Sequence, residues 1–318
     1  MGISGLLGRH SGRIHRNARN HARQCVRPHA GLLSAASANG MKAEYISGTA
    51  RLSYWDQGSG LPVVFLHPTP LDHDYWRPFV EQLLGIAAIM PDLRGHGDSE
   101  LGENLPSGDF SFVPNAPVLS MAQYAVDIIA LLDHLKLNQA VFAGCSIGGY
   151  VLLELWRQIP QRIQGLAFIC SKPQPDTTQG QQKRSETIAR ALTEGVPGIF
   201  DGMAQSLVGK TAQAKHPQTV AEVRSRMTLD VDALVAVQAG LATRPDSLPT
   251  VATISVPVLA IAGGEDPAVT AAEMEAFKSA SGGCEFHLLA DAGHFAAHEQ
   301  PERVAQIFTA WAQKNGLV

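Results

Sequence analysis

The amino-acid sequence predicts an α/β protein with a mostly parallel central sheet flanked by helices. From residue 44 onward, short apolar and β-branched runs alternate with longer amphipathic stretches, as expected for strands that are connected by helices. Residues 172–250 interrupt this alternation with several helical patterns and no convincing strand. Together the two observations predict a strand-and-helix core that carries an inserted helical block.

The predicted strands are short, and most of them are rich in Val, Ile, Leu and Phe. They cover residues 44–48, 51–56, 62–66, 86–90, 139–144, 164–170, 256–262 and 284–289. Helical patterns occupy residues 120–136, 147–159, 270–281 and 301–314. The stretch 100–119 contains several prolines and glycines, and we expect it to be a long irregular loop.

The block at 172–250, called the cap segment below, contains helical patterns at 184–194, 199–207, 219–227 and 231–242. The α/β core is then formed by residues 41–171 and 251–318. Helices inserted between two core strands are expected above the carboxyl ends of the strands, where open α/β sheets bind ligands. The cap segment is therefore a candidate lid.

Residues 1–40 differ from the rest of the chain, because they hold six arginines, no Asp or Glu and no hydrophobic periodicity. We expect them to lie outside the fold. Three interpretations stay open: a stretch upstream of a true start at Met41, an organelle transit peptide, or a nucleic-acid-binding arm. A cytoplasmic location is expected, with import into an organelle through residues 1–40 as the alternative.

The composition excludes several classes of function. The chain has 318 residues, of which 45% are hydrophobic and 17% charged, and no apolar run approaches the roughly 20 residues that a membrane span needs. Residues 41–318 are strongly acidic, which argues against nucleic acid as a partner. The four cysteines are scattered, so neither a disulfide framework nor a metal site is predicted. No nucleotide-binding glycine motif is present, and no cofactor is expected.

The most informative motif is Gly144-Cys145-Ser146-Ile147-Gly148, which directly follows a predicted strand and precedes a predicted helix. A serine at such a turn has strained backbone angles, and Gly144 and Gly148 leave room for the chain to turn. The hydroxyl is then exposed at the edge of the sheet, and the N–H of Ile147 points toward any oxyanion formed nearby. Ser146 is therefore the candidate nucleophile, and Cys145 is interpreted as a packing residue.

A serine nucleophile needs a base, and the base needs a group that orients it. Asp266 follows the predicted strand at 256–262, and His294 follows the last predicted strand in a loop before the final helix. The order Ser, Asp, His is the order expected for a serine nucleophile in this strand-turn-helix setting. We therefore expect Ser146, Asp266 and His294 to form a catalytic triad.

With these residues the chain resembles the α/β-hydrolase superfamily from about residue 44 to the C-terminus. His67-Pro68-Thr69-Pro70 is similar to the oxyanion loop of that superfamily, and the stretch from Asp92 to Ser99 is similar to its D-x-R-G-x-G-x-S turn. The resemblance implies the α/β-hydrolase fold, with the backbone N–H groups of Thr69 and Ile147 as oxyanion donors. Pro68 stands where glycine is usual, and it has no N–H to donate.

Other polar clusters have simpler interpretations. The pair His294 and His298 lacks the glutamate of a zinc motif, and Asp72-His73-Asp74 is typical of a polar helix start rather than a metal site. His67 and Trp76 are candidate pocket residues, with packing in the core as the alternative for Trp76.

The cap segment and the stretch Leu241 to Asp246 are similar to small serine esterases that include 3-oxoadipate enol-lactonases and cofactor-free haloperoxidase-like esterases. This resemblance implies hydrolysis of a small-molecule carboxylic ester or lactone through an acyl-enzyme. Epoxide hydrolases and haloalkane dehalogenases use Asp where this chain has Ser146, so those activities are disfavoured. Perhydrolysis, C–C bond hydrolysis, a lyase reaction and slow-turnover ligand binding stay open as alternatives, as do the natural substrate and the oligomeric state.

Overall fold

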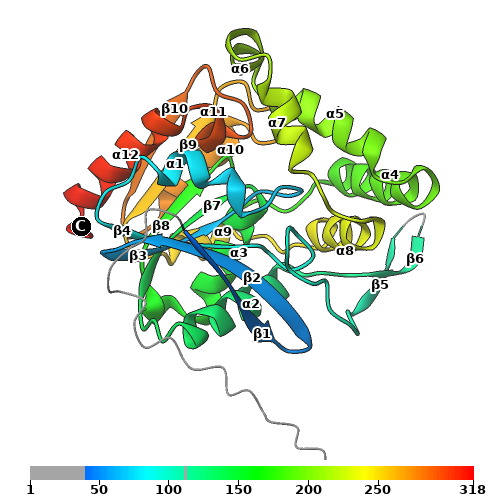
Figure 1. The fold of residues 1–318 in the computed structure, drawn as a ribbon, viewed down its shortest axis with the longest axis horizontal. Coiled ribbons are helices and arrows are strands. Elements are labelled where there is room, and N and C mark those ends of the chain that lie inside the picture. The colour runs from blue at the N-terminus through cyan, green and yellow to red at the C-terminus, as the bar shows by residue number, and fades with distance from the viewer. Residues whose placement is uncertain (1–39, 111–112) are drawn as a thin grey trace, which may run out of the picture. The chain divides into compact units, whose positions relative to one another are not determined.

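The computed structural model describes residues 40–110 and 113–318. Its central element is one eight-stranded sheet with the order β1-β2-β4-β3-β7-β8-β9-β10 (Figure 1). The strands are β1 (Met41–Ser47), β2 (Ala50–Gly58), β3 (Leu61–Leu66), β4 (Ile86–Pro91), β7 (Ala140–Cys145), β8 (Ile163–Ile169), β9 (Val258–Gly263) and β10 (Cys284–Leu289). Each strand that the sequence predicted lies in this sheet. The predictions for the arginine-rich N-terminal segment fall outside the described residues, apart from Gly40.

The sheet is mostly parallel. β2 pairs antiparallel with β1 and with β4, and the remaining pairings of the sheet are parallel. Every residue of β4, β7 and β9 is buried, as expected for parallel strands that are covered on both faces. The carboxyl ends of the six strands from β4 to β10 in the sheet order therefore meet along one edge, and the predicted α/β fold is confirmed.

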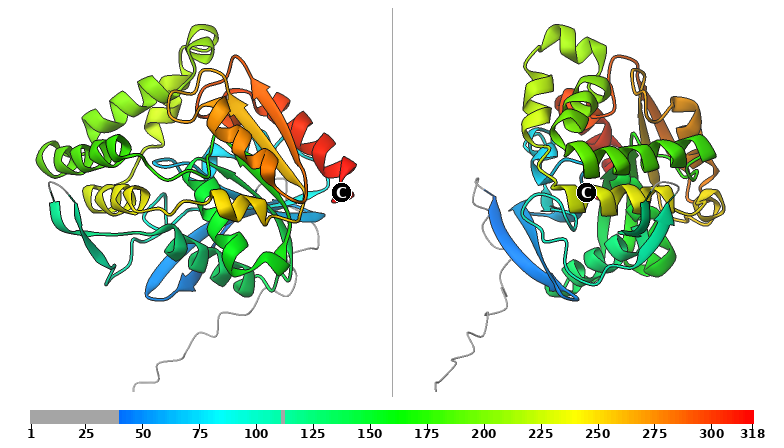
Figure 2. Two further views of the ribbon diagram at one scale, coloured as in Figure 1. Left: turned by 180° about the vertical axis from the view of Figure 1, so that it is seen from behind. Right: turned by 90° about the vertical axis from the view of Figure 1, so that its right-hand side faces the viewer.

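Helices cover both faces of the sheet (Figure 2). Gly165 and Phe168 of β8 point to opposite faces, because side chains alternate along a strand. Gly165 faces Trp311 of α12, and Phe168 stacks on Phe277 of the 3₁₀ helix η3 with ring centroids 4.1 Å apart. The helices outside the cap segment are η1 (His73–Tyr75), α1 (Arg77–Val80), α2 (Met121–His134), α3 (Ile147–Gln158), η2 (Pro160–Arg162), α10 (Ala271–Met274), η3 (Glu275–Ser279), α11 (Ala296–Glu299) and α12 (Pro301–Lys314).

The cap segment lies between β8 and β9 in the sequence. It contains α4 (Thr178–Glu194), α5 (Pro197–Leu207), α6 (Lys210–Lys215), α7 (Thr219–Ser225), α8 (Val231–Ala242) and most of α9 (Leu248–Ala252). Figure 1 shows α4, α5, α7 and α8 together beside the sheet. α4 begins before the apolar pattern that predicted it, because the side chain of Thr177 accepts from the N–H of Gly180 and caps the helix.

The prediction of an irregular loop over residues 100–119 is wrong for its second half. β5 (Ser107–Phe110) and β6 (Val113–Pro117) form a separate antiparallel two-stranded sheet. Pro114 and Pro117 concealed the strand pattern, since proline normally argues against a strand. The end of the hairpin contacts α8, because the N–H of Leu119 donates to the carbonyl of Ala236 at 3.0 Å. Among the described residues, no helix is both long and apolar enough to cross a bilayer.

Candidate active site

Ser146 occupies a sharp turn between β7 and α3. Its φ of 53° and ψ of −116° lie in a region that residues other than glycine rarely adopt. Two hydrogen bonds hold the turn: the Ser146 N–H donates to the carbonyl of Ile169 at 3.1 Å, and the Ser146 carbonyl accepts from Ser171 Oγ at 2.8 Å. The first partner is the last residue of β8 and the second lies two residues beyond it, so the strained conformation is fixed by the end of β8 and the loop that follows it.

Gly144 and Gly148 allow the backbone to approach itself closely at this turn. A Cβ on Gly144 would lie 2.5 Å from the carbonyl carbon of Gly148, and a Cβ on Gly148 would collide with the carbonyl oxygen of Leu66 at the end of β3. Because glycine has no side chain, the amino end of α3 can pack directly against β3. Ser146 therefore lies beside the loop that follows β3.

Cys145 points into the core. Its side chain is fully buried, and its sulfur contacts the carbonyl oxygen of His294 at 3.6 Å. Burial raises the pKa of this thiol far above its ordinary value, so it stays protonated and a poor nucleophile at neutral pH. The contact also places the backbone of His294 directly against the turn that carries Ser146.

His294 and Asp266 form a hydrogen-bonded pair. The Nδ1 atom of His294 lies 2.8 Å from Oδ2 of Asp266, and because a carboxylate only accepts, Nδ1 carries the proton. The other carboxylate oxygen of Asp266 accepts from the N–H groups of Ala268 at 2.8 Å and Val269 at 3.1 Å. Both side chains are nearly inaccessible to solvent. With Nδ1 engaged, Nε2 is the ring nitrogen of a neutral His294 that can accept a proton.

The three residues follow the carboxyl ends of three strands, β7, β9 and β10, which lie close together in the sheet. Asp266 and His294 lie 120 and 148 positions after Ser146 in the sequence, yet all three reach one edge of the sheet. Parallel sheets place their ligand sites at this edge. The pairing of His294 with Asp266, next to the strained Ser146, is an arrangement in which a histidine can remove a proton from a serine hydroxyl.

The loop after β3 carries Thr69. Its hydroxyl donates to Nε2 of His96 at 2.9 Å, since Nδ1 of that ring donates to the carbonyl of Arg94. Burial lowers the pKa of His96 to about 4, so the ring is neutral near neutral pH and accepts from Thr69. Thr69 is itself buried, and it precedes a cis peptide bond to Pro70.

His67 and Trp76, the candidate pocket residues, are both completely buried. His67 Nε2 accepts from the N–H of Leu93 at 2.9 Å, and Nδ1 donates to the carbonyl of Pro68 at 3.0 Å. Burial lowers the pKa of His67 to about 3. Trp76 packs on Phe65 with ring centroids 5.3 Å apart. Both residues therefore have contacts that explain them as structural, with His67 tying the loop after β3 to the turn after β4.

The turn after β4 is built around buried charges. Asp92 accepts from the backbone and ring N–H groups of His73 and from the N–H of Asp98. Arg94 donates twice to Asp127 of α2, from Nε at 2.8 Å and from Nη2 at 2.6 Å. These bonds hold the strand ends beside Thr69 and contact no atom of the Ser146, His294 and Asp266 group, so this turn is a structural support.

Asp72-His73-Asp74 is a helix start, as the sequence indicated. The side chain of Asp72 accepts from the N–H of Asp74 at 3.0 Å and caps η1. Asp74 forms an ion pair at 2.7 Å with Arg226, which lies at the end of α7 in the cap segment. The described part of the chain contains no group of His, Cys, Asp and Glu side chains that could hold a metal ion.

Sequence reasoning missed the contacts between the cap segment and the loops of the triad candidates. The N–H of His294 donates to the carbonyl of Leu207, the last residue of α5, at 2.9 Å. Glu299 accepts from the N–H groups of Gly209 and Gly293. The first bond joins two backbone groups, and the bond from Gly209 joins residues 90 positions apart, so no local pattern in the sequence could have indicated the contact with the cap segment.

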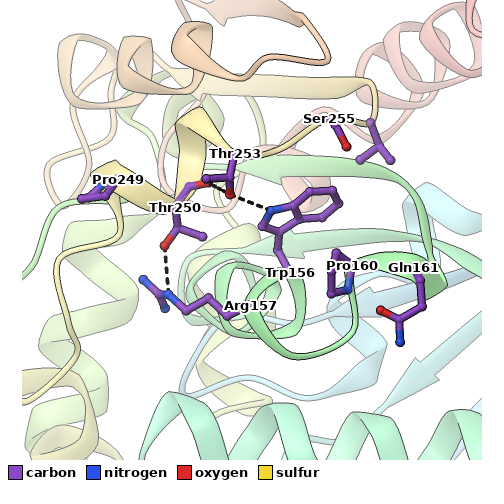
Figure 3. A pocket seen from close by; sticks show the side chains of 9 residues that line it. Trp156, Arg157, Pro160, Gln161, Pro249, Thr250, Thr253 and Ser255 are labelled. Atoms are coloured by element: carbon purple, nitrogen blue, oxygen red, sulfur yellow. Dashed lines mark hydrogen bonds between the residues drawn. The ribbon is translucent and has the colours of Figure 1, made fainter.

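A shallow groove lies at the opposite end of α3 from Ser146 (Figure 3). Trp156 and Arg157 of α3 contribute to it, and their side chains donate to Thr253 and Thr250 respectively, each at 2.9 Å. These donors are thus used in holding α9 against α3. The groove is separate from the candidate active site, which lies at the other end of this helix.

The sequence profile of the alpha/beta hydrolase family matches residues 63–307. 3-Oxoadipate enol-lactonase 1 of Acinetobacter baylyi is 28% identical over 79% of this chain and 88% of that protein. A thermophilic esterase from Thermogutta terrifontis is 30% identical with a TM-score of 0.77, covering 86% of this chain and 98% of that one. An enol-lactonase from Burkholderia xenovorans LB400, 22% identical over 85% of this chain and all of that one, shares the fold with a TM-score of 0.74.

The matched region runs from β3 to α12 and contains every strand end that carries a candidate site residue. Since the profile covers well over half of the sequence and the sheet has the predicted mostly parallel order, the chain belongs to the alpha/beta hydrolase family.

Proposed function

We propose that the protein hydrolyses a small-molecule carboxylic ester or lactone, with Ser146 as nucleophile, His294 as general base and Asp266 as the residue that orients the base. The observation that supports this most directly is the hydrogen bond from His294 Nδ1 to Asp266, with Ser146 held in strained geometry at the end of β7 on the same edge of the sheet. The esterase and enol-lactonase relatives support the same class of substrate.

In the first half-reaction, Nε2 of His294 takes the proton of the Ser146 hydroxyl while Oγ attacks the carbonyl carbon of the substrate. The carbonyl π electrons move to oxygen and form an oxyanion. When the tetrahedral intermediate collapses, the bond to the leaving oxygen breaks and His294 returns the proton to that oxygen. The alcohol leaves, or in a lactone stays attached at the far end of the acyl chain, and Ser146 carries the acyl group.

In the second half-reaction, a water molecule gives one proton to His294 and attacks the acyl carbon. Collapse of the second intermediate breaks the bond to Ser146 Oγ, and the proton on His294 passes to that oxygen. Asp266 stays ionised throughout and stabilises the imidazolium that forms twice per cycle. Its second oxygen is already engaged by two backbone N–H groups, so the carboxylate is fixed in orientation.

The oxyanion donors in this proposal are the N–H groups of Ile147, at the amino end of α3, and of Thr69. The cap segment is assigned the role of a lid that shapes the acyl and alcohol sites. His67 and His96 are neutral and buried around Thr69, so the loop presents dipoles rather than charges to the developing oxyanion.

The test is the activity of Ser146→Ala against a panel of short p-nitrophenyl esters and of lactones. We expect kcat to fall by at least about 10³-fold, because no nucleophile remains to form the acyl-enzyme. Ser53→Ala, which removes a buried serine hydroxyl from β2, is the matched control and should keep its activity. Hydrolysis by Ser146→Ala at a near wild-type rate would refute the proposal. Addition of peroxide and acetate to the wild type tests the perhydrolase alternative.

A further inference from the structure

One stretch of the cap segment, Leu207 to Thr211, lies against the loops that carry His294 and Asp266. Figure 1 shows α6, whose first turn includes part of this stretch, near α11 and the end of β10. The carbonyl of Leu207 accepts the N–H of His294 itself at 2.9 Å. The backbone of the candidate general base is thus held by the cap segment and not only by the core.

The two backbones meet at a pair of glycines. A Cβ on Gly209 would lie 2.6 Å from the amide nitrogen of Gly293, and a Cβ on Gly293 would collide with Gly209. Real Cβ atoms do not approach so closely, so any side chain here would push the cap segment and the histidine loop apart. Gly293 directly precedes His294, and a displacement at this point would move the imidazole.

Glu299 of α11 links the same two segments through its carboxylate. Oε2 accepts from the N–H of Gly293 at 2.8 Å and of Gly209 at 3.1 Å, and Oε1 accepts from the N–H of Phe295 at 3.2 Å. The residues before and after His294 are therefore both held by one side chain. Burial raises the pKa of Glu299, while the three N–H groups oppose that rise by stabilising the charged form.

Glu265 forms a second link on the other side. Its Oε2 accepts from the N–H of Thr211 at 2.8 Å, and its Oε1 accepts from the hydroxyl of Thr211 at 2.6 Å. These two bonds lower the pKa of the Glu265 carboxyl. Glu265 directly precedes Asp266, so the loops of both His294 and Asp266 are fastened to the stretch from Leu207 to Thr211.

We propose that Glu299 is a positioning residue that couples the seating of the cap segment to the alignment of His294. The cap segment then has a second role besides shaping the substrate site, because the base is in place only when Leu207 to Thr211 is docked. The inference rests on the proposed function where it is tested by kcat. Its second test, amide hydrogen exchange at His294, is independent of that function.

The first test replaces the carboxylate by an amide in Glu299→Gln. Gln keeps one accepting oxygen but turns the other acceptor into a donor that faces N–H groups. We expect kcat to fall by about 10- to 100-fold, since small misplacements of a catalytic group cost about this much, with KM within about threefold. Glu285→Gln, at the edge strand β10 and paired with Lys314, is the control and should leave both constants unchanged. An unchanged kcat in Glu299→Gln overturns the proposal.

The second test disturbs the coupling from the side of the cap segment. Gly209→Ala removes no polar group, but its Cβ cannot fit against Gly293, and we expect a fall in kcat similar to that in Glu299→Gln. Thr211→Val should produce a smaller fall, because the bond from its N–H to Glu265 remains. Thr187→Val is the matched control, since that hydroxyl donates only within α4 to Lys183. Wild-type kcat in Gly209→Ala also overturns the proposal.

Amide hydrogen exchange gives the readout that does not depend on catalysis. In Glu299→Gln the N–H of His294 should exchange at least about tenfold faster than in the wild type, while amides of β7 exchange as before. Unchanged exchange at His294 refutes the coupling. Failure of the proposed function would show separately, as an active Ser146→Ala variant. In that case the exchange result alone decides whether Glu299 couples the cap segment to His294.

Discussion

Asp266 holds His294 through a single 2.8 Å hydrogen bond to Nδ1, and the same carboxylate is fixed by two backbone N–H groups of the following turn. In Asp266→Asn, an amide N–H₂ can face Nδ1 and favour the wrong tautomer of the imidazole. We expect kcat in Asp266→Asn, measured by steady-state kinetics, to fall less than in His294→Ala, where the base is lost.

Steady-state kinetics should also show that the losses of kcat in Ser146→Ala and His294→Ala do not add, because each substitution disables the same step. Additive losses would mean that the two residues act separately.

Gly148 is predicted to be intolerant of any side chain. A Cβ there meets the carbonyl of Leu66, which is backbone and cannot move out of the way, so Gly148→Ala should lower the free energy of unfolding by about 1–3 kcal/mol or more. Gly202→Ala is the matched control, because no atom beyond its chain neighbours and the nearby backbone of α5 lies within 4 Å of its Cβ position. There the same change should raise the free energy of unfolding by about 0.5–1 kcal/mol. Urea denaturation measures the free energy of unfolding of both variants. Equal changes in Gly148→Ala and Gly202→Ala would contradict the prediction that the contact with Leu66 excludes a side chain at Gly148.

Removal of one member of the buried ion pair between Arg94 and Asp127 should strongly lower the free energy of unfolding. In Asp127→Ala the guanidinium of Arg94 stays buried without its main acceptor. We therefore expect the free energy of unfolding to fall by about 3–5 kcal/mol. The exposed pair Arg190 and Glu194 on α4 provides the comparison. Glu194→Ala should change the free energy of unfolding by less than about 1 kcal/mol. Urea denaturation measures the free energy of unfolding of both variants. Similar values for Asp127→Ala and Glu194→Ala would show that burial does not determine how much an ion pair contributes to stability.

The protein is predicted to lose stability in acid from about pH 6.5 downward. His67 and His96 have folded-state pKa values of about 3 and about 4, while an unfolded histidine has a value of about 6.5. Between these values the unfolded chain binds more protons, so stability rises with pH and falls as pH falls. Asp72, whose pKa is raised to about 6 by burial, acts in the opposite direction between about pH 4 and 6, as does Glu299, whose pKa burial also raises. Burial lowers the pKa of His298 as well, so three histidines oppose these two carboxyl groups.

The measurement is the urea midpoint at pH 7, 5 and 4. His67→Gln can still accept from the N–H of Leu93 but cannot bind the proton, so its midpoint should vary less with pH than that of the wild type. A wild-type midpoint that stays constant down to pH 4 would contradict the assignment of two neutral buried histidines.

Sequence patterns predicted the inner strands of the sheet because β4, β7 and β9 are continuous apolar runs, and burial on both faces requires such runs. The candidate triad could be named because each member stands at a recognisable strand end. The β5–β6 hairpin was missed because its prolines argue against strands. The bond between His294 and Leu207 joins residues 87 positions apart through backbone groups, which every residue type carries, so no side chain in the sequence indicates it.

The direct pairing of β8 with β9, in which Leu166 lies opposite Val258, has an evolutionary consequence. The chain leaves the sheet and re-enters it on neighbouring strands, whatever the length of the segment between them. Loop-closure entropy grows only slowly with length, so lengthening or exchanging this segment is expected to cost the sheet little, about 0.6 kcal/mol for a doubling of its length. Its fixed requirement is small: a carbonyl and an N–H where Leu207 and Gly209 now supply them, no side chain against Gly293, and a donor for Glu265 in place of Thr211, so that a new segment still docks on the histidine loop.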